Sequence, residues 1–376
     1  MVTTSVTGGS IWSGSSGEWQ ARDLQIEDDT IRAVRAPGES RSADVLDLTG
    51  LKLSPGMIEL QINGGWGIDL QHEPGRLWEL GARLPAVGVT AFLPTLTSNG
   101  AIGMDEALAA LAAGPPQGWA GAEPLGWHFE GPWLSPVKAG AHDVGALTSI
   151  PAVLDARLSP EHGVRLVTLA PELSGARAAI AELVDRGVRV SLGHTAASAA
   201  EARDGFGAGA TMGTHLFNAM DGLHHREPGL ALPLLLDGHW VGLIADGHHV
   251  APDLVDLAWR LARDRIVLVS DAVALLGMTG DEVARLDDGT LAGSVIGLDR
   301  CVRNLMRFAG VGLGRALTAA TAHPCAVLGL DDRHSVAAGQ RADLVALDAA
   351  GNVQMTMVGG QVVFDVRQES GSDGAD

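Results

Sequence analysis

The sequence predicts an α/β protein: a (β/α)8 barrel accompanied by a small β domain built from both chain ends. Two observations indicate this. Eight short apolar runs in the middle of the chain are each followed by an Ala- and Leu-rich helical stretch, and alternating strand patterns occur at both ends. Eight strand–helix units over roughly 280 residues fit such a barrel. A doubly wound parallel sheet has the same rhythm, so the pattern alone leaves both folds open.

The terminal strands are expected where apolar and polar residues alternate between polar turns. These segments are residues 21–27, 30–35, 43–48, 342–347, 353–358 and 361–366. Buried parallel strands are expected at the eight apolar runs, namely residues 56–63, 90–95, 124–130, 164–170, 188–194, 211–217, 241–246 and 265–271. We therefore divide the chain into a β domain, residues 1–52 with 336–376, and a barrel domain, residues 53–335.

Charge and cysteine content limit the classes of partner. The chain has 26 Lys and Arg residues against 45 Asp and Glu residues, a net charge of −19. Such a surface repels nucleic acids and anionic membranes, so neither is an expected partner. Cys301 and Cys325 are too few for a disulfide framework. Because the N-terminus lacks a signal-peptide pattern and no run approaches about 20 apolar residues, a cytoplasmic protein is expected.

Polar residues close five of the predicted strands: Glu130, His194, His215, Asp246 and Asp271. Strand ends meet at the active-site face of a barrel. One carboxylate and two imidazoles form a familiar ligand set for catalytic zinc that leaves a position open for water. A further carboxylate can accept a proton from that water and return one to a leaving amine. A single such histidine is more often structural, but four suitable residues at four strand ends favour a metal site.

Several motifs resemble those of the N-acetylglucosamine-6-phosphate deacetylases, a family of the amidohydrolase superfamily. The resemblance extends from Pro55 to Asp343, with the motifs in the same order along the chain. It rests on residues 128–136, 140–142, 193–195, 214–220, 226–229, 244–249, 270–272, 291–294 and 337–344. It implies an amidohydrolase barrel with a β-sandwich formed from both chain ends.

The resemblance also implies a role for each matching residue. Glu130, His194 and His215 would bind the metal ion, Asp271 would be the general base and acid, and His142 would polarise the acetyl carbonyl. Arg226 would bind the sugar phosphate, reaching across the interface of a homodimer. The full set of implied substrate-binding residues is Ala141, His142, Asn218, Ala219, Arg226, Asp246, Gly247, His248, His249, Leu291, Ala292 and Gly293.

The sequence departs from many superfamily members where two histidines usually bind a second metal ion. Gln61 and Asn63 stand there instead, and amides are weak ligands, so one divalent ion per subunit is expected. Zinc is the first expectation, and iron, manganese or cobalt suit the same ligands. His128 is expected to support the ligands. His224 and His225, beside the phosphate site, are as readily explained as solvated loop residues.

The resulting prediction is removal of the acetyl group of N-acetylglucosamine 6-phosphate by attack of a water molecule bound to the metal ion. Another N-acetylhexosamine phosphate, such as N-acetylgalactosamine 6-phosphate, is an alternative substrate. A cyclic-amide hydrolase is disfavoured by Gln61 and Asn63 and by the lack of an obvious carboxylated-lysine site. A catalytically silent phosphosugar sensor is disfavoured because Asp271 and all three ligands are present.

Overall fold

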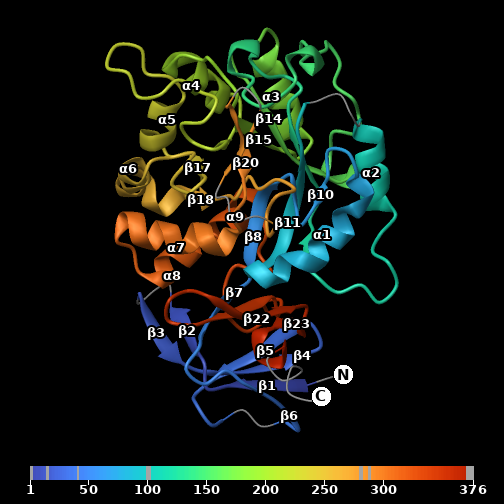
Figure 1. The fold of residues 1–376 in the computed structure, drawn as a ribbon. Helices are drawn as coiled ribbons and strands as arrows, with labels where there is room; N and C mark the ends of the chain where they lie inside the picture. The colour runs from blue at the N-terminus through green and yellow to red at the C-terminus, as the bar shows by residue number, and fades with distance from the viewer. Residues whose placement is uncertain are drawn as a thin grey trace.

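The computed structural model describes residues 3–13, 17–39, 42–98, 103–278, 283–286 and 289–369. A barrel of strands surrounded by helices forms one part of the molecule, and the sheets built from the two chain ends lie against one end of it (Figure 1). Both termini are in this second part. The terminal sheets contact the barrel near the N-terminal ends of β8 (Met57–Ile62) and β11 (Val89–Leu96), where Gly56 N donates to Asp343 O and the hydroxyl of Thr356 donates to Pro85 O.

Eight parallel strands form the barrel, and along the chain each of them pairs with the next. The barrel closes where residues just beyond the last strand pair with the C-terminal end of the first: Asp271 N donates to Gln61 O at 2.9 Å, and Asn63 N donates to Ala272 O at 2.8 Å. The barrel strands are β8 (Met57–Ile62), β11 (Val89–Leu96), β13 (Trp127–Glu130), β14 (Val164–Leu169), β15 (Arg189–Leu192), β16 (Met212–Gly213), β17 (Trp240–Leu243) and β18 (Ile266–Leu268).

Short strands occur beside the barrel. The two-residue strand β12 (Glu123–Pro124) pairs with β11. One hairpin consists of β9 (Gly64–Gly65) and β10 (Ile68–Asp69), and a second consists of β19 (Val283–Arg285) and β20 (Leu291–Ser294). Both hairpins follow the C-terminal end of a barrel strand, which places them where a substrate would enter.

Helices cover the outside of the barrel because each has one apolar face. In α7, for example, Cys301, Val302 and Leu305 are buried, the spacing of one helical face. Helix α4 begins with a capping box between Ser198 and Glu201. The α-helices are α1 (Leu77–Arg83), α2 (Met104–Ala112), α3 (Ala176–Asp185), α4 (Ala199–Gly207), α5 (Ala231–Leu236), α6 (Pro252–Ala262), α7 (Leu298–Ala309), α8 (Leu313–Thr318), α9 (Ala322–Leu328) and α10 (Val366–Glu369).

The chain ends form two sheets with a common apolar core that includes Val6, Leu24, Ile31, Leu53 and Met355. The first sheet has the order β5-β4-β1-β6 and the second β23-β22-β21-β7-β2-β3. Their strands are β1 (Thr3–Thr7), β2 (Ser10–Ser13), β3 (Glu18–Ala21), β4 (Asp23–Glu27), β5 (Thr30–Arg35), β6 (Asp44–Asp47), β7 (Lys52–Pro55), β21 (Leu344–Leu347), β22 (Val353–Val358) and β23 (Gln361–Asp365).

The predicted fold class is confirmed, and each of the eight apolar runs overlaps one barrel strand. The six predicted terminal strands also form, whereas the terminal strands β1, β2, β3 and β7 were not predicted. We keep the division at residues 52/53 and 335/336 as a proposal. The first of these boundaries falls inside β7, whose residues 53–55 pair with β21 in the terminal sheet although the division assigns them to the barrel domain. Among the described residues, no helix is long and apolar enough to cross a membrane.

Candidate active site

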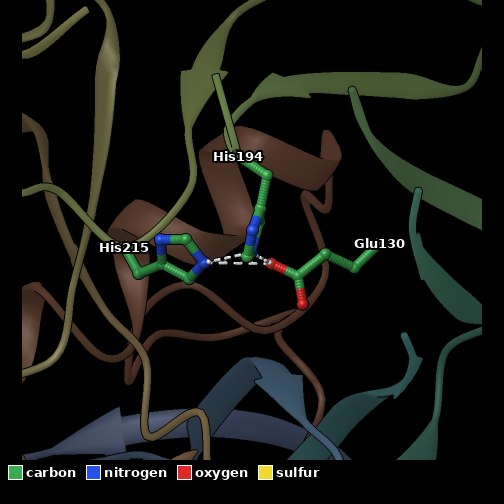
Figure 2. A group of neighbouring side chains, drawn as sticks. All are labelled: Glu130, His194 and His215. Carbon is green, nitrogen blue, oxygen red and sulfur yellow. Dashed lines mark hydrogen bonds and ion pairs between the residues drawn. The ribbon is translucent and has the colours of Figure 1, made fainter. Parts of the chain in front are cut away.

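The three predicted metal ligands meet in one buried cluster at the C-terminal ends of barrel strands (Figure 2). Glu130 is the last residue of β13, while His194 and His215 each lie two residues beyond the ends of β15 and β16. Both histidines have a positive φ, 48° and 29°. Residues with side chains rarely adopt this conformation, and such positions concentrate at functional sites. The turn after each strand thus directs an imidazole towards Glu130.

The ligand atoms of the cluster fit one divalent ion. The Nε2 atoms of His194 and His215 lie 3.2 and 3.1 Å from Oε1 of Glu130, and 3.0 Å from each other. Nδ1 of His194 lies 2.9 Å from the carbonyl oxygen of Lys138, which can only accept a hydrogen bond. In the neutral ring the proton is therefore on Nδ1, and the Nε2 lone pair faces the other two ligand atoms. This is the donor set of a catalytic metal site.

The electrostatics of the cluster support metal binding near neutral pH. Burial would raise the pKa of Glu130, but hydrogen bonds with His142, His194 and His215 outweigh it and hold that pKa well below its usual value. Burial lowers the pKa of His194 to about 4. Burial would also lower the pKa of His215, but its interaction with Glu130 raises it overall. A metal ion therefore competes with a proton mainly at His215.

Asp271 lies beside the ligands, three residues beyond the end of β18, and has a φ of 48°. Its Oδ1 accepts from Nδ2 of Asn63 at 2.8 Å and from Nε2 of Gln61 at 3.2 Å. The same Gln61 nitrogen donates to Oε1 of Glu130 at 3.1 Å. Burial and the charge of Glu130 raise the pKa of Asp271, which favours uptake of a proton. Gln61 and Asn63 thus act as hydrogen-bond donors here, which agrees with a single metal ion.

His142 has only one arrangement of its ring proton that fits its neighbours. Its Nδ1 accepts the backbone N–H of Ser98 at 2.9 Å, so in the neutral ring the proton is on Nε2. That Nε2 lies 3.7 Å from Oε2 of Glu130, on the ligand cluster. The side chain of His142 is buried. Its N–H is therefore held ready to donate to an oxygen atom beside the metal site.

A cavity of about 510 Å3 opens onto these residues. Of the predicted site residues, its wall contains Glu130, Ala141, His142, His194, His215, Asn218, Ala219, His249, Asp271, Leu291, Ala292 and Gly293. The second hairpin contributes the last three of these. Gly293 has a φ of +124°, and a Cβ there would lie 2.8 Å from the carbonyl oxygen of Asp271. A glycine is thus needed for this wall to pack against Asp271.

Asp246 holds His249 in the cavity wall. Oδ2 of Asp246 lies 2.6 Å from Nδ1 of His249, and Oδ1 accepts the backbone N–H groups of His248 and His249 at 2.8 Å each. Burial would raise the pKa of Asp246, but these bonds outweigh it and lower the pKa. Asp246, Gly247 and His248 are not among the wall residues of the described chain. Their predicted contact with substrate stays a prediction, and the structure favours a supporting role for Asp246.

Arg226 lies in an exposed loop, with its Nη1 2.6 Å from Nε2 of His225. In the described part of this single chain, the cavity wall does not include Arg226, His224 or His225. The predicted phosphate contact of Arg226 therefore also stays a prediction.

Sequence reasoning did not identify several residues of the site. Ser98 and Lys138 act through backbone N–H and C=O groups, which every non-proline residue carries, so their side chains give no signal. Gln61 and Asn63 were considered only as weak metal ligands. Other cavity residues that were not predicted are Asp69, Gln71, Thr97, Gly140, Val273, Ala274, Leu275, Leu286 and Thr290.

Comparison with known proteins agrees with this geometry. A family model described as the amidohydrolase family matches residues 53–363, and the chain belongs to that family. An N-acetylgalactosamine-6-phosphate deacetylase of Escherichia coli O157:H7 is 37% identical over 90% of this chain and 94% of that protein. An N-acetylglucosamine-6-phosphate deacetylase of Homo sapiens is also 37% identical, over 87% of each chain. Within the amidohydrolases, the chain belongs with these sugar-phosphate deacetylases.

A solved structure supports the same assignment. The N-acetylglucosamine-6-phosphate deacetylase from Pasteurella multocida superposes with a TM-score of 0.89 at 27% identity. The match covers 96% of this chain and 99% of that one. The barrel and the terminal sheets are therefore both shared with a deacetylase of this kind.

Proposed function

We propose that the protein hydrolyses the amide of N-acetylglucosamine 6-phosphate, giving glucosamine 6-phosphate and acetate. The observation that carries this proposal is one cavity that joins a Glu–His–His ligand set to Asp271 and His142. Similar proteins named as deacetylases of N-acetylated sugar 6-phosphates support the substrate class. A location in the cytoplasm, where sugar phosphates are metabolised, is part of the proposal.

Glu130, His194 and His215 would hold one divalent ion, with zinc as the first candidate and iron, manganese or cobalt as ions that suit the same ligands. When bound, such an ion would polarise the amide carbonyl and lower the pKa of a water molecule. The water can then give up a proton and attack the carbonyl near neutral pH. Because the side-chain amide nitrogen of Gln61 donates to both Glu130 and Asp271, we expect no second ion at that position.

Asp271 is the residue that moves protons in this proposal. Its Oδ1 is held by Asn63 and Gln61, which leaves Oδ2 to accept a proton from the attacking water. The oxygen of the water then forms a bond to the acetyl carbon. As the bond between that carbon and the amide nitrogen breaks, Asp271 returns the proton to nitrogen, and the free amine and acetic acid leave, the acid losing its remaining proton to solvent to give acetate. The raised pKa of Asp271 suits both halves of this cycle.

His142 would stabilise the negative charge that develops on the carbonyl oxygen. Its Nε2–H is fixed in direction because Ser98 occupies Nδ1. A donor that is already oriented needs no rearrangement during the reaction, which makes this a strong contribution to catalysis. Removal of one such donor in other enzymes costs about 100- to 1,000-fold in kcat.

The phosphate group must bind despite a net charge of −19. His249, which lies in the cavity wall and is oriented by Asp246, would supply one contact with the phosphate. Arg226 would supply the second contact from the neighbouring subunit of a homodimer, since a guanidinium can bind two phosphate oxygens at once. The remaining predicted contacts, Ala141, Asn218, Ala219 and residues 291–293, lie in the cavity wall where the sugar would sit.

N-Acetylgalactosamine 6-phosphate is a second candidate substrate, because a deacetylase named for it is 37% identical to this chain. A silent phosphosugar sensor has less support, since the ligand set, Asp271 and His142 all face one cavity. The decisive experiment measures acetate release from both sugar phosphates, and from unphosphorylated N-acetylglucosamine, using protein loaded with Zn²⁺, Fe²⁺, Mn²⁺ or Co²⁺. Preferential release from one phosphorylated sugar identifies the substrate. No release from any of them rejects the proposed function.

A further inference from the structure

A chain of hydroxyl groups and one imidazole crosses the barrel next to the metal ligands. Oγ of Ser191 lies 2.6 Å from Oγ1 of Thr214, which lies 2.8 Å from Oγ1 of Thr168. That atom lies 2.8 Å from Nε2 of His128, and Nδ1 of His128 lies 3.2 Å from the carbonyl oxygen of Leu60. The four polar side chains are each at most 1% exposed. Water therefore cannot replace any of these bonds.

The direction of every bond in the chain follows from its end at Leu60. The carbonyl oxygen of Leu60 only accepts, and the Thr95 hydroxyl, 3.4 Å from Nδ1 of His128, already donates to the carbonyl oxygen of Leu93 at 3.3 Å. Nδ1 of His128 therefore carries the ring proton, and Nε2 must accept. The hydroxyl of Thr168 therefore donates to His128, and it can accept only from Thr214. Thr214 in turn accepts from Ser191. Each hydroxyl has one fixed orientation, and loss of the hydroxyl at Thr168 would leave the buried Nε2 of His128 without a donor.

The residues of this hydrogen-bonded chain lie next to all three proposed metal ligands. His128 is on β13 two residues before Glu130, and Thr214 directly precedes His215. A Cβ at Gly193, the residue before His194, would lie 2.8 Å from Cβ of Thr214 and 3.0 Å from Cγ2 of Thr168. The two threonines thus pack directly against the backbone that leads to His194.

We propose that this hydroxyl–imidazole chain positions the metal ligands, with Thr168 and His128 as its central positioning residues. Thr168 is on β14, the strand between those that carry Glu130 and His194. Thr168 is not one of the proposed ligands, yet its hydroxyl is hydrogen-bonded to His128 on one side and to Thr214 on the other. A shift of one strand against its neighbour would break a buried bond, so the chain keeps the three ligand atoms at their spacing. This inference rests on the metal centre of the proposed function.

The test replaces Thr168 with Val, which keeps the shape of the side chain and removes its hydroxyl. The affinity of the metal-free protein for Zn²⁺ is measured by competition with a chelator, and the Co²⁺-loaded protein is examined by its visible absorption spectrum. We expect Thr168→Val to weaken Zn²⁺ binding about 10- to 100-fold, as loss of groups that support ligands does elsewhere, and to change the Co²⁺ spectrum. Thr168→Ser, which keeps the hydroxyl, should restore both.

Thr356→Val is the matched control. Thr356 is in β22, is fully buried, and donates from its hydroxyl to Pro85 O at 2.7 Å, away from the site. The Thr356→Val protein should be less stable than the unchanged protein but should bind Zn²⁺ with the same affinity. If Thr168→Val does not fold, Thr168→Ala carries the same expectation. Zn²⁺ affinity within twofold of the unchanged protein in the folded Thr168 variant would overturn the inference. Failure of the unchanged protein to bind a divalent ion would instead reject the proposed metal centre.

Discussion

The side-chain amide of Asn63 donates to Oδ1 of Asp271 over 2.8 Å. The amide of Gln61 donates to the same atom, so Oδ1 is the oxygen of the proposed general base that faces these two amides. The replacement Asp271→Asn can keep this arrangement, because an asparagine oxygen can occupy the position of Oδ1 and accept both bonds. The variant is therefore a test of the chemistry of Asp271 with little disturbance of the structure.

We expect Asp271→Asn to reduce kcat by about 100- to 10,000-fold, the usual contribution of a positioned acid or base. The metal content, measured by elemental analysis, should equal that of the unchanged protein, since Glu130, His194 and His215 are all kept. An Asp271→Asn protein that retains a substantial part of its activity would exclude Asp271 as the group that moves protons.

The replacement His142→Ala tests the proposed oxyanion donor. Because the Nε2–H would act on charge that develops during the reaction, kcat should fall about 100- to 1,000-fold with little change in KM. His334→Ala is the control, because His334 is exposed and lies outside the cavity wall. Steady-state kinetics on both variants provides the measurement. A large rise in KM at unchanged kcat would show that His142 binds the ground state of the substrate instead.

Arg226→Ala should raise KM strongly for the phosphorylated sugar and little for the unphosphorylated one. The physical reason is that only the phosphate can use both arms of the guanidinium. Equal effects on the two substrates would contradict a phosphate contact.

Mixed dimers test whether Arg226 acts across the subunit interface. Arg226→Ala subunits, which keep Asp271, are mixed with Asp271→Asn subunits, which keep Arg226. If the arginine acts on the neighbouring subunit's substrate, the mixed dimers should recover up to one working site each. Activity no higher than the sum of the two separate variants would place Arg226 in its own subunit's site.

The ligand cluster was predictable because its residues close apolar strands, and the barrel brings strand ends together. Glu130, His194 and His215 therefore needed only the positions of β13, β15 and β16. The orientation of His142 was not predictable, since it depends on a backbone N–H at Ser98. Nor could sequence show that both oxygens of Asp246 are occupied by the turn that holds His249. Such contacts are made by loops, whose sequences lack the regular apolar spacing that predicts helices and strands.

His128 is a second residue whose hydrogen-bond partners could not be predicted from the sequence. Its place two residues before Glu130 predicted a supporting role, but it gave no partner for either ring nitrogen. The partners, Leu60 O and the hydroxyl of Thr168, lie 68 and 40 residues away in sequence. Burial lowers the pKa of His128 to about 4, which agrees with the neutral ring that the chain of hydrogen bonds requires.

Glu59 leads to a prediction about stability and pH. Its Oε1 accepts the backbone N–H of Gln61 at 3.0 Å, and its Oε2 accepts that of Ser270 at 2.9 Å. Burial nevertheless raises the pKa of Glu59 to about 8, with a smaller contribution in the same direction from Asp271. Between the usual pKa of 4.5 and this value, the folded protein holds a proton that the unfolded chain has lost. The contribution of Glu59 to the stability of the fold should therefore fall as the pH rises from about 5 to 8.

The contribution of Glu59 to the free energy of unfolding should fall by up to about 1.4 kcal/mol per pH unit within this range. Glu59→Gln cannot titrate, and its amide cannot accept both backbone N–H groups, so it should carry a stability difference that does not itself depend on pH. Urea unfolding of both proteins at pH 5, 6, 7 and 8 gives the measurement. Titrating groups that do not interact with Glu59 affect both proteins alike and cancel in the difference. The unchanged protein should lose stability relative to Glu59→Gln as the pH rises. A constant difference across the four pH values would mean that Glu59 is already ionised in the folded protein at pH 5.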